Sequence, residues 1–181
     1  KNLLDLDNSV EKNINLLANA KKVKPSELTV CLLERTRHQK IIEELKRMNV
    51  KIKFIQDGDV SGVICVIDKD SPVDMYIGTG GAPEGVLAAA ALSCLGGQIQ
   101  TRLILNKDEE KRAFNMGITD FKKKYNLEEM VKGDVMFCAS GVSDGDLVKG
   151  IKDKGDKYEA STYALHKEGQ KNIKITNIHK K

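Results

Sequence analysis

The sequence predicts an α/β fold in which a mainly parallel or mixed sheet is covered by helices. Short apolar runs typical of buried strands alternate with segments of helical periodicity, and this alternation repeats three times between residues 28 and 95. The spacing allows the crossover connections that parallel strands need. A chain of 181 residues suits one domain with a single large core.

The first part of the chain supplies these units. Ser9 is a favourable N-cap for the first helix, and Pro72 ends the helix before the third strand. The expected elements are a helix over 10–20, a strand over 28–33, a helix over 38–48, a strand over 51–56, a helix over 57–66, a strand over 73–77 and a helix over 84–95.

The second part of the chain is more polar and less regular. Two alternating runs on either side of Gly169 predict a terminal hairpin over 158–166 and 172–178. The other expected elements are a strand over 98–105, a polar helix over 108–116, a helical stretch over 119–131 and a strand over 134–139.

Composition narrows the class of partner. The net charge of +4 weakly favours anionic ligands, but four Phe, four Tyr and no Trp give no platform for nucleic acid. The longest apolar stretch, residues 86–95, is too short to cross a membrane, and we expect no signal peptide. Because the first residue is Lys1, not Met, we expect a piece of a longer protein.

The four cysteines are expected to be buried structural thiols. They lie in apolar stretches with no CxxC pair, so the spacing supports neither a zinc site nor a disulfide framework. Free thiols fit the reducing cytoplasm, where we expect the protein to work. The residues are Cys31, Cys65, Cys94 and Cys138.

Three polar loops follow three of the expected strands, where ligands of open α/β sheets bind. The first loop carries Arg35 and Arg37 beside a helix start, and two guanidinium forks there could clamp a phosphate. From these residues alone, a solvated polar turn is the favoured interpretation. His38 is expected to be a surface residue at the helix start and not a catalyst.

The second loop is Asp57-Gly58-Asp59. An Asp at a helix start is usually a cap, and this is the favoured interpretation of the residues alone. Two carboxylates around a glycine can also accept hydrogen bonds from sugar hydroxyls or bind a hard metal ion.

The third loop contains four glycines between residues 78 and 85. Pro83 and the absence of Gly-Lys-Ser/Thr rule out the dinucleotide and Walker patterns, but the glycines allow a ligand to approach the backbone closely. Glu84, at the start of the next helix, is either a partner of the helix dipole or a metal ligand. A fourth segment, Gly141 to Asp146, is acidic and is expected to form a tight turn.

These motifs in this order closely resemble class II fructose-1,6-bisphosphatases, members of the lithium-sensitive sugar-phosphatase superfamily. The resemblance covers residues 9–179 and is most specific over 73–97. The motifs are Arg35-x-Arg37-His38, Asp57-Gly-Asp-Val60, Gly80-Gly-Ala-Pro-Glu-Gly-Val86, Cys94-Leu-Gly-Gly97 and Gly141-Val-Ser-Asp-Gly-Asp146.

The resemblance implies the second half of a layered sandwich of helices and sheets. It implies hydrolysis of fructose 1,6-bisphosphate to fructose 6-phosphate and phosphate, with Mn²⁺ or Mg²⁺, in gluconeogenesis and glycerol metabolism. Glu84 is then a metal ligand. The positions that contact the sugar phosphate are Arg35, Arg37, Asp57, Gly58, Asp59 and Gly81. Arg35 and Thr36 depart from the Lys and Pro that the family commonly has at these positions.

By this resemblance, residues 1–181 correspond only to the carboxyl-terminal, sugar-phosphate-binding domain of such an enzyme. The resemblance also implies that the remaining metal carboxylates and the catalytic Thr belong to the amino-terminal domain, so this chain alone is expected to be inactive. Two alternatives stay open: a non-catalytic sugar-phosphate-binding module, and an enzyme that also accepts sedoheptulose 1,7-bisphosphate. The resemblance also implies homo-oligomers, for which the terminal hairpin is a candidate interface.

Overall fold

The computed structural model describes residues 3–181. Its first sheet is parallel, with the strand order β2-β1-β3. The central strand β1 (Thr29–Leu33) pairs with β2 (Lys51–Ile55) along its whole length and with the shorter β3 (Met75–Tyr76). Both pairings are parallel, so the three strands end at the same edge of the sheet.

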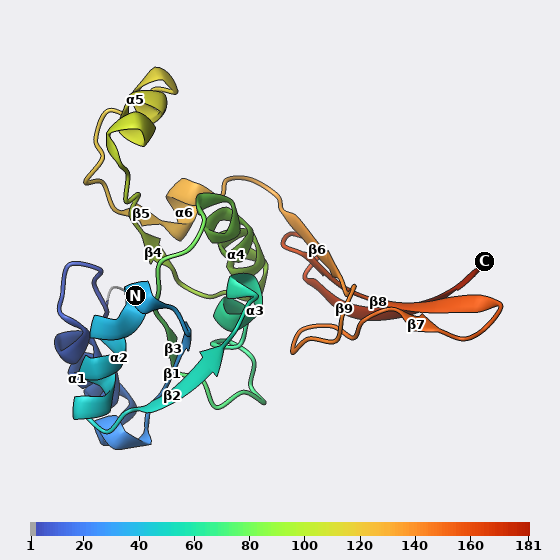
Figure 1. The fold of residues 1–181 in the computed structure, drawn as a ribbon, viewed down its shortest axis with the longest axis horizontal. Coiled ribbons are helices and arrows are strands. Elements are labelled where there is room, and N and C mark those ends of the chain that lie inside the picture. The colour runs from blue at the N-terminus through green and yellow to red at the C-terminus, as the bar shows by residue number, and fades with distance from the viewer. Residues whose placement is uncertain (1–2) are drawn as a thin grey trace.

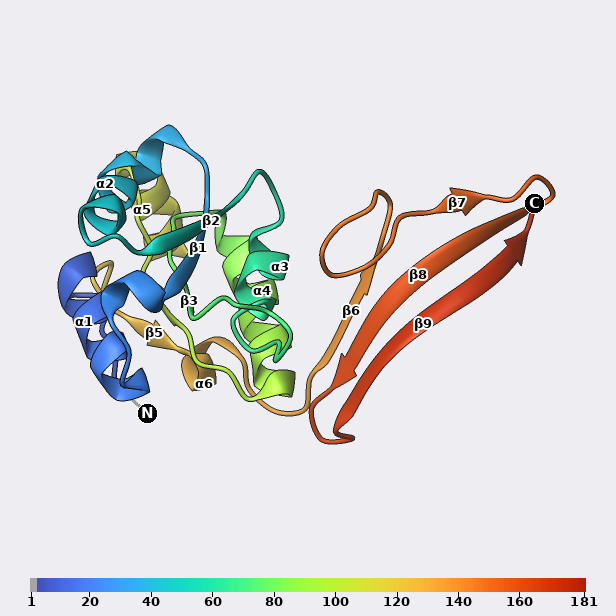
Figure 2. The same ribbon diagram turned by 90° about the horizontal axis from the view of Figure 1, so that it is seen from below.

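Helices cover both faces of this sheet (Figures 1 and 2). On one face lie α1 (Val10–Lys21) and α2 (Gln39–Arg47), with the short 3-10 helices η1 (Pro25–Glu27) and η2 (Thr36–His38). On the other lie α3 (Asp59–Ile64) and α4 (Ala82–Leu95). The main core lies between β1 and the first helix pair. Its fully or nearly fully buried residues include Ile14, Leu28, Val30, Leu32 and Leu45.

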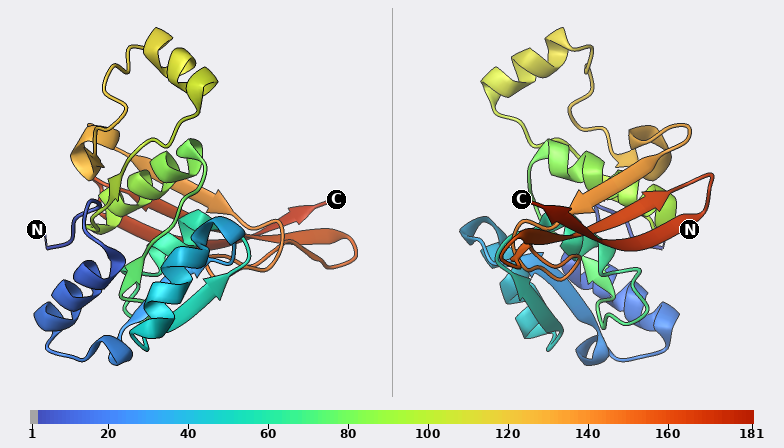
Figure 3. Two further views of the ribbon diagram at one scale, coloured as in Figure 1. Left: turned by 60° about the vertical axis from the view of Figure 1, so that its left-hand side comes forward. Right: turned by 90° about the vertical axis from the view of Figure 1, so that its right-hand side faces the viewer.

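The second large sheet is antiparallel and projects from this body (Figures 1 and 3). It pairs β8 (Lys157–His166) with β6 (Met136–Ser140), β7 (Lys152–Asp153) and β9 (Lys171–Lys180). One face packs on α3 and α4, where Phe137, Tyr163 and Leu165 bury themselves against Ile64 and Ala91. Four layers result: a helix pair, the parallel sheet, a second helix pair and the antiparallel sheet.

A smaller unit joins the two sheets. Strands β4 (Gln100–Thr101) and β5 (Tyr125–Asn126) form a short antiparallel pair, followed by α6 (Leu127–Met130). Helix α5 (Lys107–Asn115) stands at the end of an arm that extends away from the body (Figures 1 and 3).

Local signals explain most helix boundaries. Ser9 Oγ accepts a hydrogen bond from Lys12 N at 3.1 Å and caps α1. Asn106 and Glu109 form a capping box at the start of α5. Helix α4 begins with Pro83 in its first turn and ends at Gly96, whose φ of 85° lies in the left-handed region that glycine tolerates.

The α/β class and the terminal hairpin are confirmed, while several expected elements are shorter. The strands expected over 73–77 and 98–105 shrink to two residues each. Only the end of the helical stretch expected over 119–131 is helical, and β7 was not expected. After Thr101 the chain leaves the β4–β5 pair, and Arg102 instead donates to the carbonyl of Lys122 at 2.8 Å.

The expectation that all four cysteines are buried is wrong. Cys31 is buried in β1, Cys65 and Cys94 are half-buried, and Cys138 is exposed on β6. Alternation along β6 turns Phe137 toward α4 and Cys138 to the uncovered face of the sheet. In residues 3–181 no helix has the length and apolar character that crossing a bilayer requires.

Candidate functional site at the carboxyl edge of the parallel sheet

The three loops singled out in the sequence meet at one edge of the molecule. Strands β1, β2 and β3 end at Leu33, Ile55 and Tyr76, and β1 lies between the other two. The arginine loop therefore emerges between the acidic loop and the glycine loop. Residues more than forty positions apart in sequence become neighbours at this edge, as the Arg37–Thr79 contact demonstrates.

The arginine and glycine loops are joined through Thr79. Arg37 Nε donates a hydrogen bond to the Thr79 carbonyl at 2.7 Å, and the Thr79 amide donates to His38 Nε2 at 2.8 Å. His38 is 0% exposed, so the expectation of a surface residue is wrong. Sequence reasoning also gave no role to Thr79, because only its backbone takes part.

Asp59, the first residue of α3, lies against the glycine loop. A Cβ atom at Gly80 would collide with Asp59 Oδ2, so a side chain at this position would displace the carboxylate. Burial raises the pKa of Asp59, and the negative charge of Glu84 raises it further. A hydrogen bond from the Tyr76 hydroxyl and the positive charge of Arg37 oppose this shift in the pKa.

Glu84 lies in the first turn of the fourteen-residue helix α4, where the helix dipole favours a carboxylate. Its side chain folds back over the preceding loop, so that a Cβ atom at Gly81 would collide with Glu84 Oε2. Asp59 and Glu84 thus form a pair of neighbouring carboxylates beside the guanidinium of Arg37. Within residues 3–181, no group of three or more Cys, His, Asp or Glu is arranged to hold a metal ion.

Arg35 and Asp57 lie at the β2 side of the same edge. Arg35 donates hydrogen bonds to the carbonyls of Glu34 and Gln56, whereas Arg37 reaches the loop after β3. The two guanidinium groups therefore point to opposite sides of β1. The expectation that Asp57 caps the helix is wrong, because Gly58, with a φ of 86°, is the N-cap of α3. Asp57 Oδ1 instead accepts a hydrogen bond from Gly58 N at 2.9 Å.

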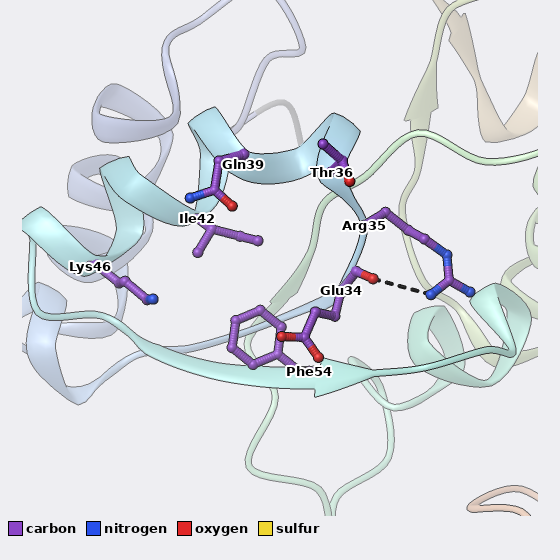
Figure 4. A pocket seen from close by; sticks show the side chains of 7 residues that line it. All are labelled: Glu34, Arg35, Thr36, Gln39, Ile42, Lys46 and Phe54. Carbon is purple, nitrogen blue, oxygen red and sulfur yellow. Dashed lines mark hydrogen bonds between the residues drawn. The ribbon is translucent and has the colours of Figure 1, made fainter.

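A pocket of about 340 Å³ opens between α2 and β2 beside Arg35 (Figure 4). Lys46, Ile42 and Gln39 line it from α2, and Phe54 lines it from β2. The Arg35 side chain turns away from these residues toward α3 (Figure 4). The pocket is therefore separate from the carboxylate pair of Asp59 and Glu84.

The fourth acidic segment lies in a longer loop between β6 and β7, where the chain bends without forming the tight turn that the sequence predicts. Gly145 N donates to the carbonyl of Val148 at 3.1 Å, and Asp144 Oδ1 accepts from Gly150 N at 2.9 Å. Asp146 forms an ion pair with Lys53 of β2, with 3.2 Å between Nζ and Oδ2. This segment thus links the antiparallel sheet to β2, a contact for which sequence reasoning had no signal.

Comparison with known proteins assigns this arrangement to a family. The family described as bacterial fructose-1,6-bisphosphatase, glpX-encoded, matches residues 1–179. A relative named fructose-1,6-bisphosphatase class 2, from Haemophilus influenzae, is 34% identical over 194 residues that cover 99% of this chain and 58% of the relative.

Two cyanobacterial relatives are named D-fructose 1,6-bisphosphatase class 2/sedoheptulose 1,7-bisphosphatase. The protein of Synechococcus sp. is 31% identical over 100% of this chain and 56% of its own length. The protein of Trichodesmium erythraeum is 34% identical over 84% of this chain and 48% of its own length. The chain spans about half the length of the curated relatives it matches. It belongs to the family of class 2 bacterial fructose-1,6-bisphosphatases.

Proposed function

We propose that residues 1–181 are the carboxyl-terminal, sugar-phosphate-binding domain of a metal-dependent phosphatase. The whole enzyme hydrolyses fructose 1,6-bisphosphate to fructose 6-phosphate and phosphate, in gluconeogenesis and glycerol metabolism in the cytoplasm. The observation that carries the proposal is the meeting of Arg37, Asp59 and Glu84, from three separate loops, at one edge of the parallel sheet. Ligands of open α/β sheets bind at this edge.

The residue types suit the parts of a bisphosphorylated ketose. In the proposal Arg35 and Arg37 neutralise and orient the phosphate that does not react, with charge-assisted hydrogen bonds. Asp57 and Asp59 accept hydrogen bonds from sugar hydroxyls. Gly58 and Gly81 let the ligand approach the backbone closely.

Glu84 is the proposed metal ligand of this domain. Carboxylate oxygens suit hard cations such as Mn²⁺ or Mg²⁺, and a cation would relieve the repulsion between Glu84 and Asp59. When bound, the metal would polarise the reacting phosphate and activate a water molecule. These cations prefer about six oxygen ligands, so two carboxylates cannot complete the site. The remaining ligands are proposed to come from an amino-terminal domain outside these residues.

An uncovered sheet face supports a further domain. The face of the β6–β8–β9 sheet opposite α4 carries Met136, Cys138, Ile173 and Ile175, and Met136 is 68% exposed. Exposed apolar patches of this kind usually mark an interface. This chain covers only about half the length of its relatives. We propose that the amino-terminal half of the longer protein covers this face of the sheet.

The names of two relatives favour a second substrate, sedoheptulose 1,7-bisphosphate. Both sugars are ketoses with phosphates at their two ends, so the roles proposed for the two arginines apply to either. Parallel assays with the two bisphosphates, using the longest native gene product, would separate an enzyme for one sugar from an enzyme for both.

The proposal is tested by phosphate release from fructose 1,6-bisphosphate with Mn²⁺. The longer native protein should release phosphate, and Glu84→Gln should abolish most of its turnover. Arg37→Ala should chiefly raise KM, because it removes a contact to the non-reacting phosphate. Residues 1–181 alone should release none. Release by this domain above the level of its Glu84→Gln variant would contradict the division of roles. If the longer native protein released phosphate from neither bisphosphate, the alternative of a non-catalytic sugar-phosphate-binding module would be supported instead.

A further inference from the structure

His38 occupies a buried position between two loops of the site. It is the last residue of η2, directly after the arginine loop, and 0% of it is exposed. Its Nδ1 lies 2.8 Å from the carbonyl oxygen of Leu33, at the end of β1. Its Nε2 lies 2.8 Å from the backbone nitrogen of Thr79, in the glycine loop after β3.

These two partners determine the state of the imidazole. A carbonyl oxygen can only accept a hydrogen bond, so Nδ1 must carry a proton. A backbone amide can only donate, so Nε2 must be the unprotonated nitrogen. His38 is therefore the neutral tautomer with its proton on Nδ1, and each ring nitrogen is used once.

The imidazole and Arg37 together hold both sides of one peptide group. His38 Nε2 accepts from the Thr79 amide, and Arg37 Nε donates to the Thr79 carbonyl at 2.7 Å. The ring also packs against the loop, because a Cβ atom at Gly78 would come within 3.2 Å of His38 Cε1. The two residues after Thr79 are Gly80 and Gly81, which make room for Asp59 and Glu84.

We propose that His38 is a positioning residue that sets the conformation of the glycine loop, residues 78–81, and through it the placement of Asp59 and Glu84. This inference rests on the proposed function for its consequence on ligand binding. The hydrogen bonds of the imidazole go to the backbone of Leu33 and Thr79. It acts through the acceptor at Nε2, which ties the glycine loop to the end of β1, the strand that the arginine loop follows.

Two amide substitutions separate this role from a general contribution to folding. In His38→Asn the side-chain amide can occupy the place of Nδ1 and still donate to Leu33, but nothing replaces the acceptor at Nε2. In His38→Gln the side-chain oxygen can reach the place of Nε2 and accept from Thr79, while the bond to Leu33 is lost. Each variant removes one buried hydrogen bond, so a purely structural residue would suffer similarly from both.

The test measures amide hydrogen exchange and fructose 1,6-bisphosphate binding in residues 1–181, with urea unfolding for each variant. We expect Thr79 to lose protection in His38→Asn and to keep it in His38→Gln. The dissociation constant should rise about tenfold in His38→Asn only, the effect of one lost buried hydrogen bond. Equal losses in the two variants would overturn the positioning role.

A measurement on the unmodified protein covers the case in which the variants do not fold. Nitrogen-15 chemical shifts should identify the tautomer protonated at Nδ1, and a ring protonated at Nε2 would overturn the inference. If the unmodified domain protects Thr79 as expected but binds no fructose 1,6-bisphosphate, the proposed function of this domain fails while the connection between His38 and the loop stands.

Discussion

Asp59, at the start of α3, and Glu84, in the first turn of α4, are neighbours at the carboxyl edge of the parallel sheet, and the charge of Glu84 raises the pKa of Asp59. Burial of Asp59 is the larger cause of this shift. Two like charges beside each other destabilise the isolated domain and are a feature of sites that bind cations.

The first prediction follows from this pair. Glu84→Gln should lower the pKa of Asp59, because it removes a negative charge but leaves the burial of Asp59 unchanged. A raised carboxyl pKa means that the folded state binds protons more tightly than the unfolded state. Stability from this group is therefore present at low pH and is lost as the pH rises through the pKa of folded Asp59.

Carbon-13 NMR titration of Asp59 would measure the shift, with Glu110→Gln in the remote helix α5 as the control. Urea unfolding above that pKa should show Glu84→Gln to be more stable than the unmodified domain. An unchanged Asp59 titration curve would mean that the two carboxylates do not interact.

The second prediction concerns Asp134, just before β6, whose carboxyl pKa is lowered, so that its contribution to stability changes with pH in the opposite direction to that of Asp59. Asp134 Oδ2 lies 2.6 Å from His166 Nε2, and its carboxylate also accepts from the amides of Glu168 and Val135. The bond from His166 is the largest cause that lowers the pKa of Asp134, followed by the bond from Glu168. This carboxylate therefore stabilises the domain above the unfolded pKa of about 3.9, and the contribution is lost as the pH falls through the folded pKa.

Urea midpoints as a function of pH would check this contribution. Asp134→Asn should flatten the loss of stability on acidification relative to the unmodified domain, while Asp70→Asn, in an exposed loop, should leave the profile unchanged. The same acid dependence in Asp134→Asn and in the unmodified domain would contradict the assignment.

The sequence predicted the parallel units well because their signals are local. Apolar periodicity and the cap at Ser9 act within a few residues, and the order of the loops then determines which side chains share an edge. Pro72 does not end a helix as expected, because α3 already stops at Ile64. His38 was misplaced because a polar residue at a helix start resembles a surface residue. Only the partners at Leu33 and Thr79, the latter forty-one positions away, make its burial favourable.

The second sheet was less predictable because its limits depend on long-range pairing. Residues 157–166 pair with three other strands, and no local sequence pattern indicates which of those strands pack against a helix. The exposure of Cys138 follows from that arrangement, since a short apolar strand looks the same whether one face or both are covered.

Cysteine reactivity provides the third prediction. Cys138 should react quickly with a thiol reagent in the native domain, because it is exposed on β6. Cys31 should react only after unfolding, because it is 0% exposed and burial raises the pKa of its thiol to about 11. Mass spectrometry after short labelling would locate the modified residue, with Cys138→Ser as the control.

The same labelling applied to the longer native protein tests the cover proposed for the second sheet. Cys138 should then be protected, because the amino-terminal half would lie over the face that carries it. Equal labelling of Cys138 in the domain and in the longer protein would place that half elsewhere.

The last prediction compares two glycines four positions apart. Gly81→Ala places a methyl group where Glu84 Oε2 lies, so the carboxylate must move, whereas a Cβ atom at Gly85 meets nothing within 4 Å. Gly85→Ala should stabilise the domain by roughly 0.5–1 kcal/mol, since alanine is favoured over glycine inside a helix. Gly81→Ala should gain no such stability, and in the longer protein it should reduce turnover with Mn²⁺ several-fold. Urea unfolding and phosphate release would check the two effects separately. Full turnover in Gly81→Ala, together with a loss of turnover in Gly85→Ala, would show that the position of Glu84 next to Gly81 has no part in the reaction.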